Sequence, residues 1–228
     1  YGHRTTLRAV AVFLFFTTGP LIPLLKGRPG QRHTVQLRTD WSFFSSPLFW
    51  IYSTSNLLMG FGYFFPALFL PSYAHALGLS TQSGALLLAL KSIAQVAGQF
   101  SFGYLSDRRT SVTALATVSA SVAAITTLSA WGLARSIAPL IVFALLYGFF
   151  GAGYTAMWAR MVTAVSDEPS AAQAIFGMFN FGKGVGNVAA GPISAGLLSW
   201  GVEGGAYGLG TYKAVVLFTG VCLLASAG

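Results

Sequence analysis

Long apolar stretches alternate with short polar connections along almost the whole chain. Seven of these stretches are long enough to cross a lipid bilayer, which takes about 20 mainly apolar residues. They cover residues 5–25, 47–70, 82–105, 111–133, 137–160, 171–199 and 210–227. Because a spanning segment must satisfy its backbone hydrogen bonds internally, the pattern predicts an all-α, polytopic helical membrane protein with about seven transmembrane helices.

Proline positions predict where some of these helices bend. Pro20 and Pro23 lie in the first span, and Pro66 lies in the second. A proline inside a helix removes one backbone hydrogen bond, and neighbouring helices in lipid can satisfy the freed group. We therefore expect kinks at these positions.

The composition also favours a membrane. Hydrophobic residues make up 54% of the chain and charged residues 8%, against about 25% charged in an ordinary soluble domain. The formal net charge of +8 would suggest a nucleic-acid partner in a soluble protein. Here the cations lie mainly in the polar connections, where they set orientation. We therefore predict an integral, multi-pass membrane protein that has lipid around it and no nucleic-acid partner; the kind of membrane stays open.

The cations also predict which side of the membrane each connection faces. The longest polar stretch, 26–46, holds four Lys and Arg residues. If this stretch is cytoplasmic, alternation of the spans places Arg108, Arg109 and Arg160 on the same side, which then holds seven cations against four. Trp131 falls at an outer end of a span, as in an interfacial aromatic belt.

Cofactor and catalytic chemistry has little support in the sequence. Cys222 is the only cysteine, and the three histidines show no metal-ligand spacing. The run 177–184 has the spacing of a phosphate-binding loop, but it lacks the magnesium-binding Ser or Thr and lies in an apolar span. No Ser/His/Asp or Cys/His set falls on neighbouring span ends. We therefore predict no enzyme activity, no cofactor and no metal.

The two ends of the chain suggest a fragment. The sequence begins with Tyr1 and shows no charged, apolar and small-residue leader, so we expect no signal peptide. The last apolar run stops at the final residues. We expect the sequence to start inside a longer protein.

Two short motifs recur in order along the chain. Residues 60–63 (Gly-Phe-Gly-Tyr) recur as 151–154 (Gly-Ala-Gly-Tyr), and 91–97, which begin with lysine, recur as 183–189. The spacing corresponds to three spans plus their connections. An odd number of spans inverts each copy relative to the other, so the pattern predicts an inverted repeat. The alternative is chance similarity in a Gly- and Ala-rich sequence.

The connection between the third and fourth spans carries the strongest local motif, Gly103-Tyr-Leu-Ser-Asp107-Arg108-Arg109. Glycine lets helices approach closely, and Asp107 lies near the next helix's N-terminus, where the helix dipole favours its charge. The arginines can pair with Asp107 or with anionic lipid. The alternative is a generic charged turn.

This connection resembles the loop motif of the major facilitator superfamily, in the copy that belongs to the carboxyl-terminal half. Residues 69–80 and 82–89 are also similar to fungal monocarboxylate-porter-like members, although Gln99 stands where related porters often carry arginine. The resemblance implies half of a major facilitator bundle, the sixth to twelfth of twelve spans. It divides the chain into 1–25, the last helix of the amino-terminal half; 26–46, a cytoplasmic central loop; and 47–228, the carboxyl-terminal six-helix bundle.

The resemblance further implies secondary transport of a small solute by alternating access, without a cofactor and together with the amino-terminal half of the same protein. The second and fifth spans would line the central cavity, and the third and sixth would flank it. Gly103, Asp107 and Arg108 would form an inner latch, or gating loop. The alternative is a non-transporting receptor, scaffold or degenerate transporter paralogue of the same architecture.

Polar residues inside the spans are the candidate solute contacts. Lys91 and Lys183 occupy matching places in the two repeats, and an unpaired charge at mid-bilayer costs about 3 kcal/mol on insertion scales. Because no Asp or Glu lies inside a span, we expect the lysines to meet an anionic solute, such as a small carboxylate, or an acid from the other half. The alternative is snorkelling or bonding to backbone carbonyls. The remaining candidate contacts are Asn56, Tyr154, Asn180 and Asn187.

Overall fold

The computed structural model describes residues 3–24, 39–108, 110–200 and 206–228. These residues form two compact units, Tyr1–Arg38 and Thr39–Gly228. In the first unit, helix α1 (His3–Thr18) passes into the 3-10 helix η1 (Gly19–Leu24). Pro20 and Pro23 therefore follow the α-helix in a tighter helix, instead of bending an α-helix that continues through them.

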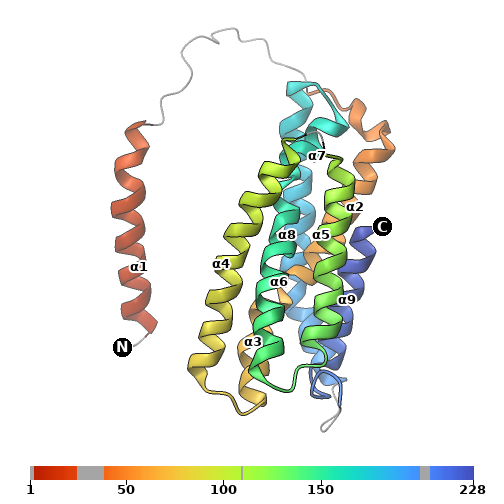
Figure 1. The fold of residues 1–228 in the computed structure, drawn as a ribbon. Helices are drawn as coiled ribbons and strands as arrows, with labels where there is room; N and C mark the ends of the chain where they lie inside the picture. Colours follow the sequence, from red (N-terminus) through yellow and green to blue (C-terminus); the bar gives the residue numbers. More distant parts are fainter. Residues whose placement is uncertain (1–2, 25–38, 109, 201–205) are drawn as a thin grey trace. The chain divides into compact units, whose positions relative to one another are not determined.

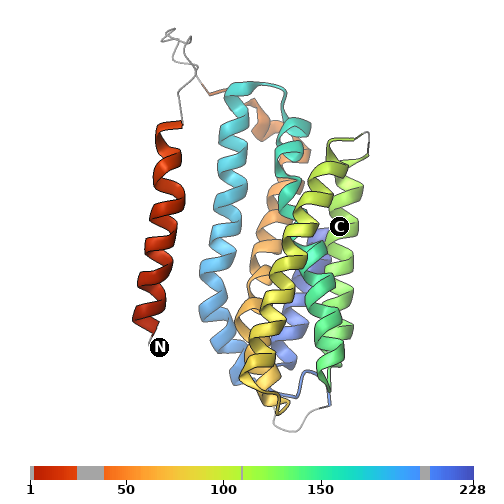
Figure 2. The same cartoon turned by 60° about the vertical axis from the view of Figure 1, so that its left-hand side comes forward.

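The second unit is a bundle of long helices that run alternately up and down (Figures 1 and 2). The helices are η2 (Ser42–Ser45), α2 (Pro47–Tyr63), α3 (Phe65–Ala76), α4 (Thr81–Ser106), α5 (Val112–Thr126), the π-helix η3 (Thr127–Trp131), α6 (Ile137–Ala156), α7 (Trp158–Val165), α8 (Pro169–Ser199) and α9 (Lys213–Ala227). The described residues contain no strand. The prediction of an all-α, polytopic helical protein is confirmed.

Four stretches of the described chain are long and apolar enough to cross a membrane. They are Pro47–Ala76, Thr81–Ser106, Val112–Trp131 and Ile137–Val165, and they coincide with the second to fifth predicted spans. The other predicted spans also form helices, but α9 is shorter, α8 is long without being as apolar, and α1 has 16 residues. The chain is an integral, multi-pass membrane protein.

Two of the long spanning stretches are broken at matching places. α2 gives way to α3 at Phe64, and α6 gives way to α7 at Met157. Pro66 lies in the first turn of α3, where its missing N–H costs little, so the irregularity predicted at this proline is confirmed. The break at Met157 has no proline. Discontinuous helices of this kind line the solute path in many transporters.

The pairing of helices in the second unit follows an inverted repeat. α2 packs along α8 as α6 packs along α4, α2 meets α9 as α6 meets α5, and α5 and α9 pack on each other. Exchanging α2 with α6, α4 with α8 and α5 with α9 therefore gives the same set of contacting pairs. The helix contacts therefore support the repeat that the two sequence motifs predict.

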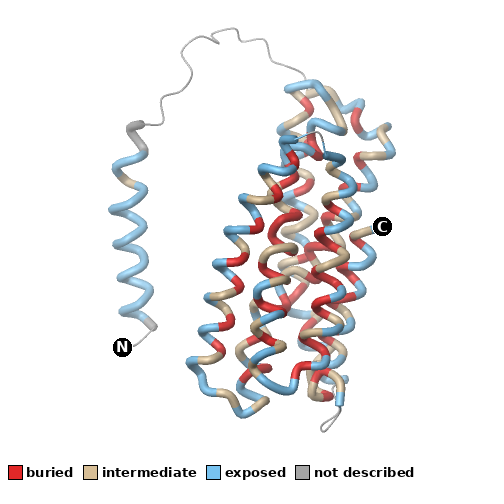
Figure 3. Tube along the Cα trace, viewed as in Figure 1, coloured by how far each residue is buried: buried red, intermediate tan, exposed pale blue. Residues whose placement is uncertain are grey.

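Glycines bring the paired helices into backbone contact. A Cβ added at Gly98 of α4 would lie 2.0 Å from the Phe149 carbonyl oxygen of α6, and one at Gly186 of α8 would lie 2.4 Å from the Gly60 carbonyl carbon of α2. Only glycine permits such close crossings. The buried residues follow the inner faces of these helices (Figure 3).

Two expectations from the sequence are wrong for this unit. A Cβ at Gly103 would meet no described atom within 4 Å, so Gly103 does not bring two helices together here. Trp131 is 0% exposed and stacks on Phe143 with ring centroids 5.2 Å apart, so it packs inside the bundle and not at an interface. Its position at the end of a span concealed the tertiary contact.

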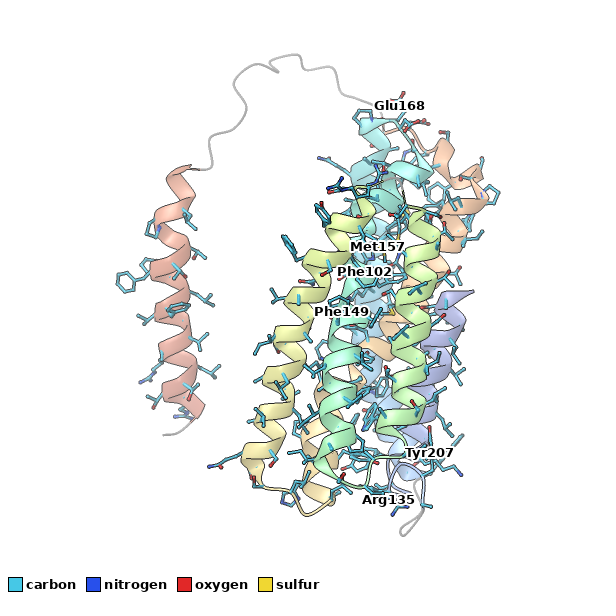
Figure 4. The ribbon with its side chains drawn as sticks, viewed as in Figure 1. Phe102, Arg135, Phe149, Met157, Glu168 and Tyr207 are labelled. Atoms are coloured by element: carbon cyan, nitrogen blue, oxygen red, sulfur yellow. The ribbon has the colours of Figure 1, made fainter. Side chains whose placement is uncertain are left out.

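The connection between α8 and α9 is fastened to η3 and to the turn before α6. The Tyr207 hydroxyl donates to the Leu128 carbonyl at 2.7 Å, and Arg135 donates to the Ala206 carbonyl. Burial raises the pKa of the Tyr207 hydroxyl. Arg135 and Tyr207 lie at one end of the bundle, and Glu168 lies at the other (Figure 4).

Candidate functional site

The two lysines of the repeat reach the same aromatic ring. Lys91 on α4 places its Nζ 6.0 Å from the centroid of Tyr63, and Lys183 on α8 places its Nζ 4.1 Å from that centroid. The two nitrogens are therefore no further apart than the sum of these two distances. The structure thus brings together two candidate residues that are about 90 positions apart in the sequence.

Each ammonium group also lies near a second ring. The Tyr147 centroid is 5.9 Å from Nζ of Lys91, and the Trp158 centroid is 5.2 Å from Nζ of Lys183. The faces of aromatic rings are electron-rich and attract cations at these distances. The two charges are thus partly compensated by rings from α2, α6 and α7.

Glycine contacts fix the backbone that carries each lysine. A Cβ at Gly60 would lie 3.0 Å from the Lys183 Cα, and one at Gly148 would lie 2.4 Å from the Lys91 carbonyl oxygen. In each pair the glycine lies on the first helix of one repeat and the lysine on the second helix of the other. The repeat symmetry therefore positions both lysines in the same way.

Neither ammonium group has a hydrogen-bond acceptor among the described residues. Lys91 is only 8% exposed, and Lys183 is partly buried. The four described acids lie outside the helices: Asp40, Asp107, Asp167 and Glu168. Asp40 accepts bonds from the Ser42 hydroxyl at 2.7 Å and the Ser42 N–H at 2.9 Å, and these bonds lower the pKa of its carboxyl. An ammonium that is largely withdrawn from water and has no acceptor is costly, so an anion bound beside it would offset that cost.

Several buried polar atoms near the contact of α2, α7 and α8 are also unpaired in the described structure. They are Ser53 Oγ, Asn56 Oδ1, Asn187 Oδ1 and Trp158 Nε1. Asn56 donates from its Nδ2 to the Tyr52 carbonyl at 2.9 Å, and Asn187 lies one helical turn beyond Lys183. Buried polar groups are usually satisfied, so spare donors and acceptors here are consistent with a polar ligand.

Two other predicted contacts have different surroundings. Tyr154 is fully buried, and its hydroxyl lies 2.5 Å from Ser55 Oγ, which donates its one proton to the Ser226 carbonyl at 2.5 Å. Tyr154 must therefore donate to Ser55, and it lines a separate cavity of about 370 Å³ next to α2, α5 and α9. Asn180 is exposed on α8 and donates to the Phe176 carbonyl at 2.9 Å.

The predicted gating loop lies at the end of α4. The Asp107 N–H donates to the Gly103 carbonyl at 3.2 Å, and Asp107 and Arg108 are exposed. The Arg108 guanidinium lies 4.7 Å from the centroid of Tyr104 and donates to its hydroxyl, so in this structure its partner is Tyr104 and not Asp107. Arg109 lies outside the described residues.

Sequence reasoning missed the contact that ties this loop to α7. Arg160 donates from Nε to the Ser106 carbonyl at 3.1 Å, in the last turn of α4. The last carbonyls of a helix lack intrahelical partners, and a nearby cation can satisfy them. The sequence alone predicts only that Arg160 is one of the cytoplasmic cations. Its place near an inner end of a span, like that of Asp107, is the signal that could have found this contact.

The family model that matches the chain is that of the Major Facilitator Superfamily, over residues 53–227. The chain belongs to the major facilitator superfamily. It is similar to "MFS transporter asaE" of Aspergillus flavus, at 27% identity over 98% of this chain and 49% of the relative. It is also similar to "Monocarboxylate transporter 12-B" of Danio rerio, at 25% identity over 90% of this chain and 43% of the relative.

A third similar protein is "Aspyridones efflux protein apdF" of Emericella nidulans, at 28% identity over 64% of this chain and 30% of the relative. The chain spans about half or less of the length of these curated relatives. The resemblance to fungal superfamily members and to monocarboxylate transporters that the sequence motifs indicate is therefore confirmed.

Proposed function

We propose that the full-length protein carries a small solute across a membrane by alternating access, and that the solute bears an anionic group, such as a carboxylate, which binds near Lys91 and Lys183. Membership of the superfamily and the transporter names of its relatives support the transport function. The observation that carries the anion is Lys91, which is only 8% exposed and whose ammonium has no acceptor among the described residues.

The charge distribution of the bundle favours an anion over a neutral solute. Two ammonium groups converge on Tyr63, and the four described acids lie outside the helices. A carboxylate would receive charge-assisted hydrogen bonds from the lysines, and such bonds are stronger than neutral ones. One relative is named a monocarboxylate transporter, which agrees with this chemistry.

Alternating access would use the amino-terminal half as the second wall of the solute path. The paired breaks at Phe64 and Met157 supply places where α2–α3 and α6–α7 can bend. The loop of Gly103, Asp107 and Arg108 would act as the inner latch, with Arg160 holding the end of α4 to α7. In this proposal the solute meets the lysines between the two halves of the protein.

Uptake by the purified full-length protein in lipid vesicles tests this function. Labelled pyruvate, benzoate and succinate serve as anionic probes, and glucose serves as the neutral one. We expect saturable uptake of an anion and none of glucose. A folded protein that binds an anion without moving it would favour the alternative, a receptor or degenerate paralogue.

Replacement of the lysines tests the site itself. Lys183→Gln should raise KM for the transported anion about tenfold or more and leave protein abundance unchanged, because it removes a charge-assisted contact. Lys213→Gln is the matched control, since Lys213 is exposed at the start of α9. An unchanged KM in both Lys91→Gln and Lys183→Gln would end the anion-site hypothesis.

A further inference from the structure

Tyr63 is the only described residue whose ring is near both ammonium groups. Building on the proposed function, we infer that Tyr63 is the positioning residue of the anion site: its ring holds Lys91 and Lys183 at one place so that a single anionic group can reach both. Tyr147 and Trp158 each serve one lysine.

The ring has this role because other constraints on the lysines are few. A lysine side chain has four rotatable bonds, and a salt bridge or hydrogen bond usually restricts it. Among the described residues neither ammonium has such a partner, and both meet aromatic faces instead. A cation–π contact restrains a cation without neutralising it, so the charge stays available to an anion.

The backbone in turn fixes Tyr63. It is the last residue of α2, and its carbonyl accepts a hydrogen bond from the Tyr147 hydroxyl at 3.0 Å. One turn earlier, Gly60 packs against the backbone of Lys183. The last turn of α2 therefore contacts Lys183 twice, through Gly60 at the main chain and through Tyr63 at the ammonium.

This arrangement links the site to the break between α2 and α3. Tyr63 immediately precedes Phe64, where the helix is interrupted, and Lys91 and Lys183 come from α4 and α8. Rotation of the last turn of α2 would move the ring relative to both lysines at once. Tyr63 would therefore set the affinity for the anion, although it makes no hydrogen bond to that anion in this proposal.

Substitutions of Tyr63 in the full-length protein in vesicles test the inference, with the labelled anion that the wild-type protein transports. Tyr63→Leu removes the ring and should raise KM about tenfold, with maximal rate and abundance close to wild type. Tyr63→Phe keeps the aromatic face and should restore KM to within about twofold of wild type. Tyr73→Leu, at a buried ring packed on Trp131, is the control for loss of aromatic packing; it should lower thermal stability without changing KM.

A double-mutant cycle separates positioning from packing. If the ring acts through the lysines, Tyr63→Leu should change KM less in a Lys183→Gln background than in the wild-type protein. An unchanged KM in a well-folded Tyr63→Leu protein, or equal effects of Leu and Phe, would overturn the inference. If Tyr63→Leu does not accumulate, Tyr63→Met, which fills the same space without an aromatic face, replaces it, and an unchanged KM there would equally overturn the inference.

The outcomes also separate this inference from the proposed function. If the lysine substitutions leave anion KM unchanged, the anion site itself is wrong. If the lysine substitutions raise KM and the loss of the Tyr63 ring does not, only the positioning role falls.

Discussion

Asp107 carries an exposed side chain at the end of α4, and its backbone N–H donates to the Gly103 carbonyl. Because the side chain is exposed, its loss should cost the fold little. We expect Asp107→Asn to leave abundance near normal and to reduce the initial uptake rate about tenfold or more, since the proposed latch would lose its only carboxylate.

The matched control is Asp167→Asn, at another exposed acid outside the helices, in the connection between α7 and α8. This substitution removes the same charge and should leave uptake unchanged. Normal uptake by Asp107→Asn would remove the latch role of this residue.

Single residues show where prediction from the sequence ends. The repeat can be recognised in the sequence alone, and it predicts that Lys91 and Lys183 occupy corresponding positions. Tyr63 belongs to the other recurring motif, 60–63, and its part in the site depends on where two lysine side chains from α4 and α8 end relative to α2. The sequence carries no signal for such long-range contacts beyond an aromatic residue beside a helix break.

Two glycines on α4 predict opposite outcomes for the same substitution. A Cβ at Gly98 would lie 2.0 Å from the Phe149 carbonyl oxygen, whereas a Cβ at Gly103 would meet no described atom within 4 Å. We expect Gly98→Ala to force α4 and α6 apart and to cost about 1–3 kcal/mol of stability. Gly103→Ala should fold normally.

Thermal unfolding of the two purified variants, followed by light scattering or tryptophan fluorescence, measures this difference. Equal stability of Gly98→Ala and wild type would show that the crossing of α4 and α6 can relax. Reduced uptake by a fully stable Gly103→Ala would place the role of Gly103 in the movement of the loop, as the gating proposal requires.

Most helices follow from hydropathy, but the breaks in them do so only in part. Pro66 marks the interruption near Phe64, because proline has no N–H to donate to the carbonyl four residues earlier in a continuous helix. Met157 has no such marker, and its break matches the first one only through the repeat. The pairing of α2 with α8 depends on the close contact of Gly60 and Gly186. In a Gly-rich sequence, the pattern does not reveal which glycines lie at helix crossings.

At the scale of the whole molecule, orientation in the membrane is the property that the cation bias predicts. Thr110, in the turn between α4 and α5, and Ser136, in the turn before α6, are exposed and lie at opposite ends of the α5 span. With cysteine at either position, an impermeant thiol reagent on intact cells should label Ser136→Cys and not Thr110→Cys. Permeabilisation should make both reactive.

The native Cys222 is buried and should contribute little background. Labelling of Thr110→Cys in intact cells would reverse the orientation, and with it the side on which the latch closes.

The uneven apolarity of the helices has a consequence for biosynthesis. α8 carries Lys183 and the polar residues Asn180 and Asn187, and it is not among the helices that are apolar enough to cross a bilayer alone. Its natural neighbour, α2, precedes it by more than 100 residues and is part of such a helix. Insertion of the nascent α8 is therefore most favourable when the earlier helices are already in the membrane next to it. The Lys183 ammonium is then surrounded by protein and not by lipid. The residues that would bind the solute would in this way also set the order in which the chain enters the membrane.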